Sequence, residues 1–64
     1  MKRKELKKLA KRLAELEIII QNSPDGYGKK AAQHEVLMIS SMVEDVDDML
    51  TLDEMVQEIL KENS

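Results

Sequence analysis

The sequence predicts an all-α protein: an antiparallel helical hairpin plus a short third helix, a three-helix bundle formed as a single domain from 64 residues. Apolar residues recur at spacings of three and four over most of the chain, which places them on single faces of helices. The sole proline and both glycines fall between positions 24 and 28, where they mark one break between helices. A chain this short has a core near the lower size limit, so each helix is expected to contribute to it.

The first helix is expected over about 3–22. The Lys, Arg, Glu and Ala residues between its apolar positions are strong helix formers. The apolar positions themselves follow spacings of three and four, and they are Leu6, Leu9, Leu13, Leu16 and Ile20.

The second helix is expected over about 25–50, beginning between Pro24 and Lys29. Ser23 fits an N-cap, with Pro24 in the first turn where its missing N–H does no harm. The apolar arc is wider than one neighbouring helix needs, so we expect a partner chain to cover Met38 and Met42. The main stripe consists of Ala32, Val36, Ile39, Val43, Val46 and Leu50.

The third helix is expected over about 52–62. Thr51 and Glu54 fit a capping box, in which the threonine caps the first turn and the glutamate reaches back to it. A short amphipathic pattern follows at Leu52, Met55, Val56 and Ile59.

Charge is divided unevenly along the chain. Residues 1–22 hold seven Lys and Arg against three Glu, whereas residues 31–64 hold nine Asp and Glu against Lys61. An antiparallel hairpin sets the basic start of the first helix beside the acidic residues 44–48, so the asymmetry favours that pairing. The competing interpretation is a basic arm that binds nucleic acid.

Composition excludes several kinds of chemistry. With no cysteine and one histidine, disulfides, thiol catalysis and a histidine-rich metal site are ruled out. The loop around Gly26 and Gly28 lacks the pattern of a phosphate-binding loop, and the acidic residues 45–53 lack that of an EF-hand. No nucleophile and base can be paired. We therefore expect no enzyme activity, no cofactor and no metal. Since no run of 18 apolar residues exists, we also expect no membrane contact, and a cytoplasmic location for a natural chain.

One face of the second helix lacks the Lys and Glu that usually fill exposed helical positions. Leu37 lies there, opposite the main stripe, and Ile18 is off the stripe of the first helix. We expect this surface to bind another protein with Leu37 as its anchor, although single exposed leucines are ordinary. The expected contact residues are Ile18, Gln33, His34, Leu37, Met38, Ser40 and Ser41.

Residues 5–17 read Glu-Leu-Lys-Lys-Leu-Ala-Lys-Arg-Leu-Ala-Glu-Leu-Glu, a near-ideal binary helix pattern. Together with Ser23-Pro24-Asp25, a favoured designed helix start, this segment resembles de novo designed three-helix mini-proteins. The resemblance implies a non-enzymatic binding protein of engineered origin. The second helix departs from that style through its methionines and the pair Ser40-Ser41.

These observations predict a helical protein–protein binding module whose partner is another protein or a second copy. The alternative is a small homodimeric nucleic-acid-binding regulator that uses the basic face of residues 3–22. A third interpretation is an acidic decoy formed by residues 52–62. The acidic character of that last segment argues against a DNA-reading recognition helix.

Overall fold

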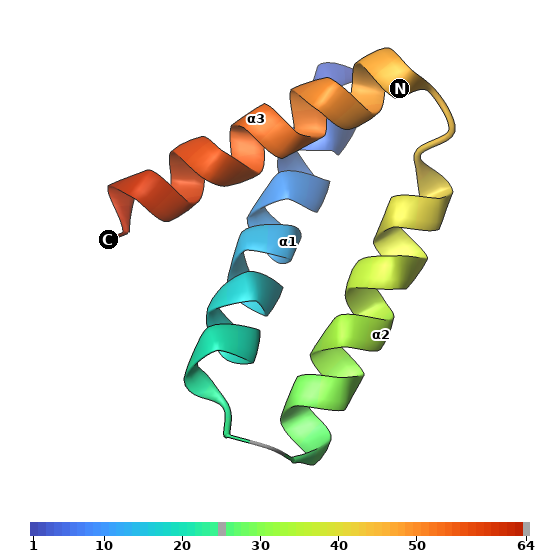
Figure 1. Cartoon of the computed structure of the whole chain (residues 1–64). Coiled ribbons are helices and arrows are strands. Elements are labelled where there is room, and N and C mark those ends of the chain that lie inside the picture. The colour runs from blue at the N-terminus through green and yellow to red at the C-terminus, as the bar shows by residue number, and fades with distance from the viewer. Residues whose placement is uncertain (25, 64) are drawn as a thin grey trace.

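The computed structural model describes residues 1–24 and 26–63. It contains three helices, α1 (Arg3–Asn22), α2 (Tyr27–Met42) and α3 (Val46–Glu62), and no strand among the described residues. Figure 1 shows α1 and α2 as an antiparallel hairpin, with α3 crossing α1 at an angle. The predicted all-α fold is thus confirmed. The third helix is not short, because its 17 residues exceed the 16 of α2.

Helix α1 is the centre of the fold. Both other helices pack along it, whereas α2 and α3 scarcely touch one another. The predicted apolar stripe of α1 is confirmed, with Leu6, Leu13 and Leu16 buried. Ala10 and Ala14 are also buried, at 0% and 1% exposure. Their small side chains allow a neighbouring helix to approach α1 closely.

The connection between α1 and α2 lies where the proline and glycines of the sequence predict a break. Helix α1 ends at Asn22, and the N–H of Ser23 donates to the Ile19 carbonyl at 2.9 Å. Ser23 therefore caps the end of α1, and its predicted role as the N-cap of the second helix is wrong. That position belongs to Gly26, which has no side chain to cap with. Helix α2 begins at Tyr27, inside the predicted interval.

The second connection lies earlier than the sequence predicts. Helix α2 ends at Met42, and residues 43–45 are non-helical, with Val43 and Asp45 extended, before α3 begins at Val46. The Asp45 carboxylate caps α3 by accepting a hydrogen bond from the Asp47 N–H at 2.9 Å. Thr51 lies inside α3, where its Oγ1 donates to the Asp47 carbonyl at 3.0 Å. The predicted capping box at Thr51 is therefore wrong, as is a single helix over 25–50.

Charge pairing supports the predicted hairpin only in part. The start of α1 does lie beside the acidic segment, with the Met1 α-amino group 2.9 Å from Asp48 Oδ2. That segment opens α3 rather than closing α2. Within the hairpin, Arg12 of α1 holds Glu35 of α2 through two hydrogen bonds, one of them 3.0 Å long. Exposed pairs of this kind orient helices more than they stabilise them.

The three helices bury less surface against one another than those of a closed bundle would. The accessible surface is 5126 Å², against about 4200 Å² expected for a compact monomer of this mass. The radius of gyration is 11.8 Å, against about 10.7 Å for a compact chain of this length. Because α2 and α3 both pack on α1 but diverge from each other, an open space remains between these two helices.

Candidate functional site

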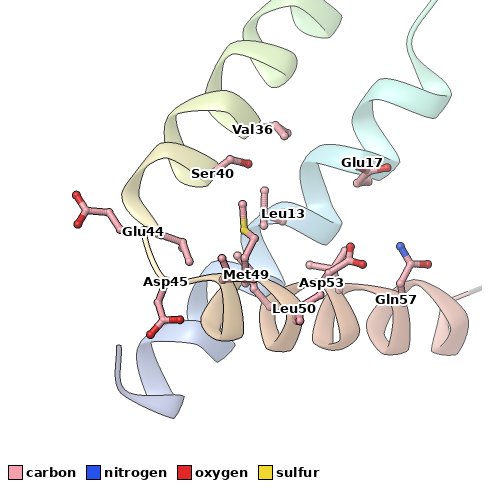
Figure 2. Close-up of a pocket in the computed structure, with 14 residues that line it drawn as sticks. Leu13, Glu17, Val36, Ser40, Glu44, Asp45, Met49, Leu50, Asp53 and Gln57 are labelled. Carbon is pink, nitrogen blue, oxygen red and sulfur yellow. The ribbon is translucent and has the colours of Figure 1, made fainter.

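A groove of about 470 Å³ lies between α2 and α3, over the central part of α1. Its floor is apolar and buried, which ties the groove to the core of the protein. Figure 2 shows side chains from all three helices around it, with Leu13 of α1 at the centre. The floor residues are Leu13, Val43, Leu52 and Val56.

The two walls of the groove are largely apolar as well. On the α2 side they are formed by Val36 and Ser40. On the α3 side, Met49 extends from its helix toward Leu13 (Figure 2). Val46 and Leu50 lie at the α3 rim and are 73% and 60% exposed. Apolar side chains at this rim remain in water until something covers them.

The charged groups around the groove all carry the same sign. Glu17 of α1 and Asp53 of α3 lie at one end, and Glu44 and Asp45 lie at the other beside the connection (Figure 2). None of these four carboxylates forms an ion pair with a residue that the structure describes. No Lys, Arg or His among residues 1–24 and 26–63 lines the groove. The groove therefore combines an apolar floor with a negative electrostatic potential.

Helical periodicity explains why these residues gather. On α3, the series Val46, Leu50, Asp53 and Gln57 advances by four, three and four positions, so it occupies one side of the helix. The buried pair Leu52 and Val56 occupies the adjacent side, which faces α1. The groove side of α3 thus changes from apolar to polar along its length.

The structure divides the predicted contact residues among different surfaces. Ser40 lines the groove. Leu37, which is 68% exposed, lies three positions before Ser40 and so shares its side of α2. Gln33, seven positions before Ser40, also lies on that side. His34 and Ser41 are exposed farther round the helix, where the Ser41 hydroxyl donates to the Met38 carbonyl at 2.7 Å. Leu37 is off the core, as the sequence predicts.

Ile18 and Met38 do not belong to this surface. Ile18 lines a shallow hollow with Gln57 and Leu60 of α3, so it lies on the side of α1 that faces α3. The expected patch shared by Ile18 and Leu37 is therefore not formed. Met38 is exposed on the far side of α2, nearly opposite Ser40 by helical periodicity, with Met42 one turn further along. Helix α3 does not cover these methionines.

Glu35 lies at the edge of the hairpin, outside the groove. Hydrogen bonds from the Arg12 guanidinium lower the pKa of its carboxyl below the ordinary value. Arg12 also contacts Glu15 at 3.1 Å. This cluster joins α1 to α2 and contributes no group to the groove.

Other kinds of site find little support in the part of the chain that the structure describes. No three His, Cys, Asp or Glu side chains there lie close enough together to hold a metal ion. No helix found there has the length and apolar character needed to cross a membrane. Lys4, Lys7, Lys8 and Lys11 line one shallow basic hollow on α1.

Comparison with protein families, with curated proteins and with solved structures finds no match to this chain. The sequence interpretation misses most of the groove residues because it assigns Val46 and Leu50 to the core stripe of one long helix. The sequence does contain a signal for the start of α3. Asp45 fits an N-cap, and Asp47 and Asp48 fit the acidic first turn of a helix.

Proposed function

We propose that the protein is a non-enzymatic module that binds another protein through the groove between α2 and α3. The observation that carries this proposal is the excess of accessible surface over a compact monomer, about 900 Å². One partner in a standard protein–protein interface buries about 800 Å². The surface left open by the three helices is thus the size that one partner covers.

The composition of the groove supports the same conclusion. Interfaces have an apolar centre surrounded by polar residues. Leu13, Leu52 and Val56 supply such a centre, and the exposed Leu50 supplies an anchor at the rim. Of the predicted face, the proposed contact surface keeps Ser40, which lines the groove, while Gln33 and Leu37 lie on the exposed side of α2 next to it.

A display experiment tests this function. A library of random helix-forming peptides about 20 residues long, enough for about 30 Å of helix, is selected against the protein. It is counter-selected against the Leu50→Asp variant. We expect peptides whose affinity falls about 30-fold in Leu50→Asp, since loss of an apolar anchor that a bound peptide covers costs about 2 kcal/mol. Amide chemical shifts should map their binding to residues around Leu13, Met49 and Val56.

Met38→Asp is the matched control, because Met38 is a similarly exposed apolar residue on the other side of α2. It should leave peptide binding unchanged. The absence of any selected peptide, or equal loss in both variants, would contradict the proposal. Salt-dependent binding of a random RNA pool that is lost when Lys7 and Lys11 are replaced by Ala would instead favour the nucleic-acid alternative.

A further inference from the structure

The shape of the open space indicates what kind of segment fits it. Helices α2 and α3 both lie against α1, yet they diverge from each other (Figure 1). A rod placed between them contacts the floor at Leu13 and both walls at once. Packed helix axes lie about 8–10 Å apart, so an α-helix in this position would become the fourth member of a four-helix arrangement.

Charge indicates the composition of that segment. Within the described part of the chain, the lining holds four carboxylates and no cationic group. An occupant with glutamates along its edges would meet like charge. A purely apolar occupant would leave the four carboxylates without a cationic partner near a dehydrated surface. Lys or Arg beside an apolar stripe satisfies both requirements.

Symmetric pairing of two copies through this groove does not supply that combination. Pairing two grooves face to face would set Glu17 and Asp53 against their own copies. The basic surface of α1 fits poorly as well. One of its hollows is lined by lysines without an apolar anchor. In a second, Arg3, Lys7 and Lys11 adjoin Met55 and Ile59, but Glu58 and Glu62 lie there too and would meet the carboxylates of the groove. Neither hollow thus presents an apolar stripe flanked by positive charge alone, which is what the groove needs.

We propose that the groove binds a basic amphipathic helix of another protein, with its apolar stripe on Leu13 and Val56 and its cationic side chains toward Glu17 and Asp53. This inference rests on the proposed protein-binding function and narrows it to one class of partner. Helices of this class present apolar anchors at spacings of three, four and seven.

The test compares two synthetic helix-forming peptides of about 18 residues, long enough to be helical when bound. One places lysine beside a leucine stripe, and the other has glutamate at every lysine position. Calorimetry at physiological salt should show binding of the Leu/Lys peptide at least tenfold tighter than that of the Leu/Glu peptide. The difference should shrink at 1 M salt, where the screening length is about 3 Å.

Two charge-neutralised variants locate the effect. E17Q/D53N removes two carboxylates from the groove, and E54Q/E58Q removes two exposed carboxylates that do not line it. Both change the net charge equally. We expect about tenfold weaker Leu/Lys binding for E17Q/D53N, given roughly up to 1 kcal/mol for each partly exposed pair, and little change for E54Q/E58Q. Circular dichroism establishes that both variants are folded.

Each other outcome contradicts the inference in a distinct way. Equal binding of the two peptides means that the groove does not select positive charge. Equal losses in the two variants mean that the Leu/Lys peptide responds to net charge alone. Concentration-dependent dimerisation abolished by Leu50→Asp would identify a second copy as the occupant. If display peptides bind the groove but carry no excess of Lys and Arg, the protein-binding function stands and the basic-helix inference falls.

Discussion

The two connections between helices are produced by different physical causes. Between α1 and α2 the chain is interrupted by Pro24 and Gly26, residues that disfavour a helix through the backbone itself. Between α2 and α3, residues 43–45 contain neither proline nor glycine. There the interruption is stabilised by side chains, with Val43 buried among the three helices and Asp45 capping α3.

The difference has a direct effect on shape. The first connection returns the chain antiparallel to α1, and Arg12 holds Glu35 across the hairpin. The second leads α3 away from α2, which opens the groove. A connection caused by proline and glycine can be predicted from the sequence. A connection stabilised by tertiary packing cannot, because the apolar pattern continues through it without interruption.

Replacing Val43 tests whether packing stabilises the second connection. Val43→Ala removes two buried methyl groups and should lower the free energy of unfolding by about 2 kcal/mol. Val46→Ala is the matched control, because this valine is three residues away and largely exposed. It should change stability by less than about 0.5 kcal/mol. Equal effects in urea denaturation would mean that Val43 does not anchor the turn.

Removing the cap should have the next largest effect. Asp45→Ala deletes the acceptor for the Asp47 N–H and should cost about 1 kcal/mol, as N-cap losses usually do. Asp45→Asn keeps an acceptor and should recover most of that loss. Thr51→Ala should cost less than Asp45→Ala, in contrast to the prediction from the capping-box pattern. A larger loss of thermal stability for Thr51→Ala than for Asp45→Ala would indicate that the helix begins at Thr51.

At the first connection a substitution is expected to stabilise the protein. Gly28 lies in the first turn of α2 without a positive φ angle, and an added Cβ would meet only the Ser23 Oγ at 3.9 Å. Gly28→Ala should therefore raise the free energy of unfolding by about 0.5 kcal/mol, mainly by restricting the unfolded chain. A loss of stability would show that this position needs the freedom of glycine.

The smallest expected effect is a dependence on pH from the hairpin ion pair. Arg12 lowers the pKa of Glu35 below the ordinary value of 4.5, so the pair stabilises the folded state above that pH. The stability gained over Glu35→Gln should be constant near neutral pH and decline as the pH falls below 4.5 through the lowered pKa. The decline should weaken in 1 M salt because the pair is exposed. A difference that is the same at every pH would contradict this role.

Much of the fold could be predicted because it depends on periodicity. The bounds of α1, the buried Leu13 and Leu16, and the interruption near Pro24 all follow from residue spacing and backbone chemistry. The end of α2 could not be predicted in that way, because Val43 and Val46 continue the same apolar series while one is buried and the other exposed. The groove could not be predicted either, since it exists only because the chain turns between these two valines.

The packing of α2 on one side also affects its local fluctuations. Helix α2 packs mainly on α1 and has no side-chain N-cap, whereas α3 is capped by Asp45. Its backbone hydrogen bonds should therefore open in local fluctuations that leave α1 and α3 paired, and its amides should exchange with solvent earliest. One wall of the groove thus opens as an independent unit. A bound segment would slow that exchange, so recognition by this surface and the order of α2 are coupled.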